Sequence, residues 1–152
     1  MADPVSADAA CIAMELRPIG SIRTPYRRLG DCPANLDSAG DPVTIELYPQ
    51  YADGLSGVEA ASHLIVLYWL GAAQRDRLRA VSRADGRVRG VFANRSPARP
   101  NPIGIGIVRL LRREGLLLTV SGLDCLDGTP LLDLKPYLPW LDPVPDTTVA
   151  WR

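Results

Sequence analysis

The alternation of apolar and polar positions predicts a chain built mainly from short strands. Residues 43–47 alternate with a period of two, which is typical of a half-buried strand. Residues 62–70 form a continuous apolar run, which indicates a strand buried on both faces. Residues 105–112 and 116–123 lie on either side of the turn Glu114-Gly115 and predict a β-hairpin.

Weaker patterns complete the predicted fold. Three segments predict further short strands: 14–22, 89–93 and 131–134. Residues 72–84 carry the one helical pattern, with Leu78 and Val81 facing inward and the arginines facing solvent. Short strands separated by turns, with one or two short helices, predict a mainly β barrel or sandwich.

The segments between these elements predict loops and ends. Residues 26–41 read as a long exposed loop and residues 48–57 as a turn-rich connection. Residues 1–13 predict a flexible tail, and residues 14–152 predict a single domain. We expect Trp140 and Trp151, in the proline-rich end of the chain, to pack on the body of that domain.

Composition narrows the class of protein. The chain has 17 basic and 17 acidic residues, which argues against a domain saturated with phosphate contacts. Its three cysteines, Cys11, Cys32 and Cys125, are widely spaced and suit a reducing compartment better than a disulfide framework or a metal site. Its apolar runs are too short to span a bilayer. We therefore expect a cytoplasmic protein with no membrane segment and no metal.

The segment Arg95–Gly104 is the first candidate site. Pro97, Pro100 and Pro102 fix φ and remove amide donors, so the segment predicts a stiff extended loop. Arg95 suits a carboxylate or phosphate through bidentate hydrogen bonds, and Arg99 could share that role. Asn101 could bind an amide or a purine edge, or cap the turn. The alternative is a proline-rich crossover whose arginines are merely solvated.

Other polar residues are weaker candidates. Asp127, Gly128, Thr129 and Pro130 form a strong turn signal that also offers a carboxylate, a hydroxyl and backbone amides. His63 is the only histidine and stands at the start of an apolar strand. Lys135 and Asp133 share a face, which predicts an ion pair on the surface. These residues support a β domain that binds a small molecule or nucleotide, without a nucleophile–base pair.

Five ordered blocks of sequence closely resemble the TsaA-like (TrmO-type) family. The blocks are 19–26, 57–64, 90–104, 121–130 and 132–137. The resemblance implies a small antiparallel β-barrel, not a Rossmann sheet, with S-adenosyl-L-methionine as cofactor. It also implies a homodimer with the cofactor near the subunit interface. The implied reaction is methylation of N6 of threonylcarbamoyladenosine next to the tRNA anticodon.

The resemblance also implies site residues, position by position. The cofactor-binding positions are Arg95, Ile105, Asp127, Gly128, Thr129, Pro130, Gly71, Ala72, Pro33, Ala34 and Asn35. Pro33 to Asn35 stand where the family usually carries Pro-Arg-Gln. Asp127 is the candidate catalytic residue, either orienting the cofactor or accepting a hydrogen bond from the attacking nitrogen.

Several alternatives stay open at this point. Arg99, Asn101, His63 and Lys135 are candidates for contacts with the substrate or a dimer partner. The chain ends soon after Tyr137 and carries no net basic charge, which leaves a small metabolite as an alternative acceptor to tRNA. A non-catalytic domain that binds the cofactor or a nucleotide is the third reading.

Overall fold

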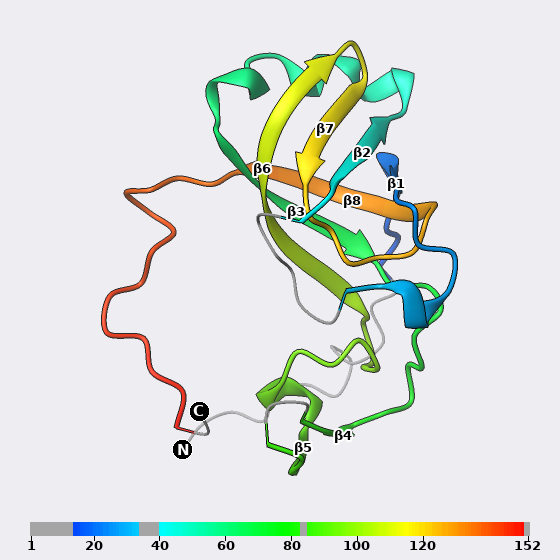
Figure 1. The fold of residues 1–152 in the computed structure, drawn as a ribbon, viewed down its shortest axis with the longest axis vertical. Coiled ribbons are helices and arrows are strands. Elements are labelled where there is room, and N and C mark those ends of the chain that lie inside the picture. Colours follow the sequence, from blue (N-terminus) through cyan, green and yellow to red (C-terminus); the bar gives the residue numbers. More distant parts are fainter. Residues whose placement is uncertain (1–13, 34–39, 83–84, 151–152) are drawn as a thin grey trace, which may run out of the picture.

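A closed antiparallel barrel of six strands forms the body of the protein (Figure 1). The structure is a computed structural model that describes residues 14–33, 40–82 and 85–150. The barrel strands are β1 (Gly20–Arg23), β2 (Pro42–Leu47), β3 (His63–Trp69), β6 (Ile103–Glu114), β7 (Leu117–Ser121) and β8 (Thr129–Pro136). Their spatial order is β1-β2-β7-β6-β3-β8, and β8 closes the barrel on β1. The expected mainly β barrel is confirmed.

The barrel interior is filled by alternate residues of each strand. Leu64, Val66 and Tyr68 of β3 point inward and are at most 3% exposed. Val43 and Ile45 of β2 face them across the core, which confirms the half-buried strand predicted at 43–47. Because strand side chains alternate between two faces, the period-two pattern sorts directly into inside and outside.

The predicted hairpin at 105–123 is confirmed as β6 and β7. Gly115 adopts φ +60° in the turn between the two strands. A left-handed conformation of this kind favours glycine because it has no Cβ. Local turn chemistry and alternation therefore specify this pair of strands without help from the rest of the fold.

The prediction that residues 62–70 are buried on both faces is wrong. Along β3 the residues alternate between buried and half-buried. The outward side chains Ile65, Leu67 and Trp69 lie opposite Ile107, Ile105 and Ile103 of β6, respectively. A closed barrel covers only its inner face, so a fully apolar strand leaves an apolar ladder on the outside.

The helix predicted at 72–84 is also wrong. Residues 79–81 form β4 (Arg79–Val81), which pairs with β5 (Val88–Gly90) in a separate two-stranded ribbon. Leu78 and Val81, expected to face inward, are 62% and 64% exposed. Gly86 in the connecting turn has φ +71°, and pairing with β5 supplies the hydrogen bonds that a helix would have supplied.

The described residues contain no α-helix, and their helical turns are all short. The 3₁₀ helices are Leu29–Asp31, Pro49–Leu55, Val58–Ala60 and Val91–Ala93. None of the helices in this part of the chain is long and apolar enough to cross a membrane.

Other boundaries differ from the sequence expectation. The first strand begins at Gly20, not at residue 14, and the strand predicted at 89–93 divides into the end of β5 and a 3₁₀ turn. The last strand extends the predicted 131–134 to Thr129–Pro136. Trp140 is 80% exposed, so it does not pack on the body; after β8 the chain runs away from the barrel (Figure 1). Trp151 and the predicted tail 1–13 lie outside the described residues.

Candidate functional site

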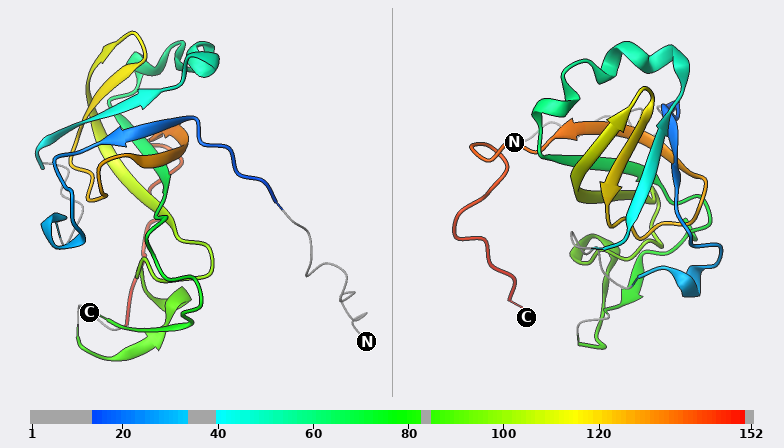
Figure 2. Two further views of the ribbon diagram at one scale, coloured as in Figure 1. Left: turned by 90° about the vertical axis from the view of Figure 1, so that its right-hand side faces the viewer. Right: turned by 45° about the horizontal axis from the view of Figure 1, so that its top comes forward.

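All loops that carry the candidate motifs leave the barrel at one end. Because neighbouring strands are antiparallel, β1, β3 and β7 end there and β2, β6 and β8 begin there. The connections at this end span residues 24–41, 70–102 and 122–128. In Figure 2 these loops and the β4–β5 ribbon lie below the barrel. The closure of the barrel thus gathers loops that are distant in sequence.

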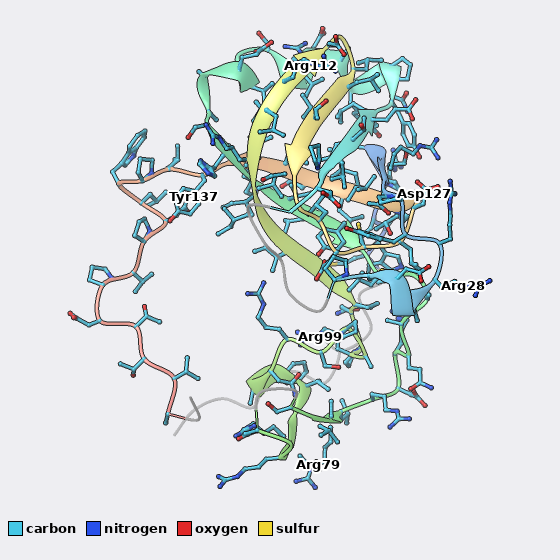
Figure 3. The ribbon with its side chains drawn as sticks, viewed as in Figure 1. Arg28, Arg79, Arg99, Arg112, Asp127 and Tyr137 are labelled. Atoms are coloured by element: carbon cyan, nitrogen blue, oxygen red, sulfur yellow. The ribbon has the colours of Figure 1, made fainter. Side chains whose placement is uncertain are left out.

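Arg99 holds the proline loop in shape from within. Its Nε donates to the Ser96 carbonyl at 2.8 Å, and its Nη2 donates to the carbonyls of Val91 at 2.8 Å and Asn94 at 2.6 Å. Figure 3 shows Arg99 inside the loop region below the barrel. A planar guanidinium can bridge several carbonyls at fixed angles, which a lysine cannot do. The predicted stiff loop is therefore braced by an arginine as well as by prolines.

The Arg95 side chain extends from the proline loop to the start of strand β6. Its Nη2 donates to the Ile105 carbonyl at 3.3 Å, so the structure brings together the two residues that the resemblance implied for the cofactor site. The Arg95 side chain is exposed and its other guanidinium donors have no acceptor among the described residues. Asn94 Nδ2 next to it is buried and also has no partner in this part of the chain. An exposed guanidinium and, one residue before it, an amide without a partner are donors that suit a carboxylate from a bound molecule.

Tyr68 and Asp124 form a polar contact at the mouth of the barrel. The Tyr68 hydroxyl donates to Asp124 Oδ1 at 3.0 Å. Burial, and then the neighbouring Asp124 carboxylate, raise the pKa of Tyr68 well above its usual range, while Arg95 acts in the opposite direction. Neither residue is a candidate from the sequence pattern. The one sequence signal is that Asp124 stands three residues before Asp127, in the segment 121–130.

Asp127 ties the β7–β8 loop to the segment after β1. Its Oδ1 accepts from the Thr24 amide at 3.1 Å and its Oδ2 accepts from the Arg27 guanidinium. Gly128 adopts φ +77°, and its amide donates to the Ile22 carbonyl at 2.8 Å. Figure 3 places Asp127 beside the start of β8. With both oxygens engaged, the carboxylate is suited to holding two loops together.

Thr129 and Pro130 are placed differently from each other. Thr129 is buried, and its hydroxyl donates to the Leu126 carbonyl at 2.7 Å, so it closes the turn. Pro130 faces outward and lines a groove of about 560 Å³ at the same end of the barrel. The groove is lined by Met14, Leu16, Pro18, Trp69, Arg75, Asn101, Ile103, Pro130 and Leu132. Asn101 therefore shares a surface hollow with Pro130.

One cation lies in this mostly apolar groove. The Arg75 guanidinium stacks over the Trp69 ring, 5.4 Å from its centroid, and its Nε donates to the Pro100 carbonyl at 2.9 Å. Cation–π stacking fixes a guanidinium while leaving its edge free for an anion. The groove thus combines apolar walls with a positioned positive charge.

The remaining cofactor candidates lie at the same end with fewer contacts. Gly71 and Ala72 are exposed in the turn after β3. The Leu70 amide, just before them, donates to the Pro102 carbonyl of the proline loop at 2.9 Å and so joins this turn to that loop. Pro33 is exposed after the first 3₁₀ helix. Ala34 and Asn35 lie outside the described residues.

His63 and Lys135 lie at the opposite end of the barrel. His63 begins β3, six residues before Trp69, which is about 20 Å at ~3.3 Å per residue. Its Nδ1 lies 2.9 Å from Ser62 Oγ, and its carbonyl accepts from the Tyr137 amide. Lys135 pairs with Asp133 at 2.8 Å, as the shared face predicted. The fold does not bring these two residues to the Arg95 loop.

The two described cysteines belong to no group of described residues that could hold a metal ion. Cys125 is buried, and burial raises the pKa of its thiol to about 12. Burial also raises the pKa of the half-buried Cys32. Both are free thiols, and the described part of the chain contains no group of three or more residues able to hold a metal ion.

A closed antiparallel β-barrel with an arginine-braced loop at one end defines the class of domain, which is built without a Rossmann sheet. The particular family follows from comparison. The chain belongs to the tRNA-methyltransferase O family, since the model described as the N-terminal domain of that protein matches residues 21–143. The family expected from the five sequence blocks is thereby confirmed.

Curated relatives agree on the cofactor. The chain is 48% identical over 138 residues to a probable S-adenosyl-L-methionine-binding protein of Archaeoglobus fulgidus, covering 91% of this chain and 38% of that protein. It is 44% identical over 129 residues to a protein of the same description from Methanothermobacter thermautotrophicus, covering 85% and 93%. It is 34% identical over 150 residues to the tRNA (adenine(37)-N6)-methyltransferase of Escherichia coli, covering 91% and 64%.

Solved structures match as well. A crystal structure of TrmO superposes with a TM-score of 0.76 at 36% identity, over 91% of this chain and 64% of that one. TrmO from Pseudomonas aeruginosa gives 0.74 at 36% identity, over 90% and 61%. The chain thus spans a little under two thirds of the TrmO chains. The comparisons thus place the chain in a family whose relatives are named as S-adenosyl-L-methionine-binding proteins and as a tRNA methyltransferase.

Proposed function

We propose that this protein methylates N6 of threonylcarbamoyladenosine at position 37 of tRNA, with S-adenosyl-L-methionine as methyl donor. The observation that carries the proposal is the contact of Arg95 with the Ile105 carbonyl, which leaves its other guanidinium donors without an acceptor among the described residues; the preceding residue, Asn94, has an unpartnered amide. An amino-acid carboxylate matches these donors. The Escherichia coli relative, named for this tRNA position, supports the choice of acceptor.

The residues present fit this cofactor. Arg95 and Asn94 would hold its carboxylate, and Ile105, which is 44% exposed beside them, offers apolar contact. When bound, the cofactor would supply a methyl group activated on its sulfonium. The protein's task is then to align donor and acceptor.

Asp127 acts as a positioning residue in this proposal. Both of its oxygens are engaged, by the Thr24 amide and by Arg27. It therefore holds the β7–β8 turn at the site, and of the two roles open to it, orientation fits the geometry better than proton acceptance.

Transfer of a labelled methyl group tests the proposal. Purified protein incubated with methyl-labelled cofactor and tRNA from cells that lack this methylation should label the adenosine at position 37. In calorimetry, Arg95→Ala should weaken cofactor binding at least about tenfold, the loss of one charge-assisted contact. Arg17→Ala is the matched control, because Arg17 is exposed and pairs only with Glu15.

Two alternatives have distinct outcomes in the same assay. The archaeal relatives are named only as cofactor-binding proteins, which favours a non-catalytic binding domain as the second candidate. Such a domain would bind the cofactor and label nothing. A methyltransferase acting on a small metabolite would label a cell extract but not tRNA. Either result would contradict the proposed acceptor.

We also propose that the protein works as a homodimer through the apolar ladder on the outside of β3 and β6. The ladder consists of Ile65, Leu67 and Trp69 opposite Ile107, Ile105 and Ile103. Its β6 members are 42–47% exposed. Three adjacent apolar cross-strand pairs on an outer face favour burial against another molecule. Since Ile105 belongs to the ladder and adjoins Arg95, a second copy there would lie beside the cofactor.

A further inference from the structure

The β4–β5 ribbon and its flanks form a projecting arm, which we call the arginine arm (residues 74–92, described over 74–82 and 85–92). Figure 1 shows the ribbon at the far end of the loops, away from the barrel. The arm is joined to the candidate site at its base. The Val91 amide donates to the Leu78 carbonyl at 3.0 Å, and the Val91 carbonyl accepts from Arg99 of the proline loop.

Positive charge is concentrated in this part of the chain. Residues 74–99, the arm and the proline loop, contain eight arginines and two aspartates. Their net charge is +6, although the chain as a whole is neutral. A chain with zero net charge can therefore contain a strongly basic segment. Such a segment is able to make phosphate contacts even though the chain as a whole is neutral.

The described arginines of the arm outnumber their carboxylate partners, because Arg87 and Arg89 share the single carboxylate of Asp85. Most described cations outside the arm and the proline loop form an ion pair: Arg17, Arg23, Arg27, Arg112, Arg113 and Lys135. Within the arm, Arg89 takes both oxygens of Asp85, and Arg87 lies 4.0 Å from the same carboxylate. Arg79 makes no hydrogen bond or ion pair to another described residue. Arg77 reaches only the Gln74 amide oxygen, at 2.9 Å.

Exposed apolar side chains accompany these arginines. Val81 and Val88 lie opposite each other on the open face of the ribbon, on the side that also carries Arg79. They are 64% and 59% exposed, and Phe92 at the base of the arm is 82% exposed. An exposed aromatic ring on a segment rich in arginines is a combination that suits unpaired RNA, since bases can stack on the ring and phosphates can pair with the cations.

We propose that the arginine arm is the RNA-docking element of this protein: Arg79 and Arg87 bind backbone phosphates, and Phe92 stacks on an unpaired base. The proposal rests on the proposed tRNA function and specifies which surface holds the acceptor. A second copy of the chain is the alternative occupant, because the rest of the chain carries the compensating negative charge, and the oligomeric state of the variants distinguishes it from RNA. Because Val91 at the base of the arm contacts the proline loop, RNA bound to the arm is positioned next to the loop that carries Arg95.

The test measures RNA binding separately from methylation. The probe is a fluorescent anticodon stem-loop RNA, titrated by anisotropy without cofactor at two salt concentrations. R79A/R87A should weaken binding about tenfold or more and reduce the salt dependence by roughly one phosphate contact per arginine. F92A should weaken binding with the salt dependence unchanged, because stacking releases no counterions. Cofactor affinity should stay at the wild-type value in all of these variants.

The matched control is R17A/R112A, which removes two exposed barrel arginines; Figure 3 shows Arg112 at the opposite end of the molecule from Arg79. It should leave RNA binding unchanged. RNA affinity equal to wild type in R79A/R87A and F92A would overturn the proposal. So would a change from dimer to monomer in these variants, which would make the arm a contact between copies. If wild-type protein binds the RNA through the arm but labels no tRNA, the proposed function fails and the arm proposal stands.

Discussion

The Tyr68 ring lies directly over Gly104 of the neighbouring strand. A Cβ at Gly104 would stand 2.2 Å from Tyr68 Cε2 and 2.6 Å from Cδ2. The two residues are opposite each other in the β3–β6 pairing. This close approach sets the Tyr68 hydroxyl against Asp124 at the mouth of the barrel and explains the glycine at the end of the proline loop.

Gly104→Ala should therefore destabilise the barrel by about 1–3 kcal/mol, the usual cost of overpacking a filled core. The measurement is urea unfolding followed by circular dichroism. Gly54→Ala is the control, since a Cβ there meets nothing within 4 Å and should change stability by less than about 0.5 kcal/mol. Equal stability of the two variants would show that the ring moves aside at no cost.

The raised pKa of Tyr68 predicts a specific loss of stability in alkaline solution. Its folded-state pKa lies above the unfolded value, so its contribution is complete below about pH 10 and declines as the pH rises further. Between pH 10 and pH 11 the wild type should lose about 1 kcal/mol more than Tyr68→Phe. Urea unfolding at both pH values gives the difference, in which all other titrating groups cancel. Parallel pH profiles would contradict the assignment.

Arg99→Lys should loosen the proline loop while leaving the barrel folded. A lysine cannot span the three carbonyls that Arg99 bridges, so the amides of the loop should exchange hydrogen faster and cofactor affinity should fall by about tenfold. Hydrogen-exchange mass spectrometry and calorimetry measure the two effects. Arg112→Lys, on an exposed pair with Glu114, serves as control. Unchanged exchange in the loop would mean that the prolines suffice.

Asp127→Asn should separate positioning from proton transfer. The amide keeps an acceptor for Thr24 but loses its charge toward Arg27, so cofactor affinity should fall about tenfold. The kcat at saturating cofactor should change by no more than about threefold, which is well under 1 kcal/mol in barrier. A large fall in kcat with a lost limb of the pH profile would instead make Asp127 a proton acceptor. Asp133→Asn, on β8 where the carboxylate pairs with Lys135, is the control.

Ile107→Lys should dissociate the proposed homodimer. A charge at the centre of the apolar ladder would remain desolvated in the interface, which is unfavourable. Sedimentation velocity should show the wild type as a dimer and the variant as a monomer. Leu117→Lys, at a similarly exposed apolar position on β7, should leave the dimer intact. A monomeric wild type would exclude the dimer proposal.

The sequence predicted the elements whose signals are local. Residues 43–47 and the hairpin around Gly115 appear as predicted because alternation and turn chemistry act over a few residues. The helix expected at 72–84 does not form, because its two apolar positions specify no face and pairing with β5, in which Ala80 lies opposite Arg89, supplies the backbone hydrogen bonds instead. Trp140 stays exposed for a related reason: apolar character does not say whether a surface is available to receive it.

The candidate site likewise contains features that the sequence predicted and contacts that it did not predict. The Arg95 loop could be singled out from its prolines and arginines, and the family resemblance joined Arg95 to Ile105. That Arg99 braces the loop, and that Tyr68 meets Asp124 across 56 positions, could not be predicted, because these contacts depend on where distant strands lie. The basic arm could not be predicted from the net charge either, because a total of zero does not show how positive and negative side chains are distributed over the surface.

The sequence by itself determined which residues alternate, where the chain must turn and which loop is stiff, since these follow from side-chain and backbone properties of neighbouring residues. Only the tertiary structure decided the rest. Closure of β8 on β1 and β3 placed the candidate loops at one end, kept His63 and Lys135 at the other, and left an apolar ladder and an arginine arm uncovered. These outcomes depend on pairing between strands far apart in the chain, which no local pattern encodes.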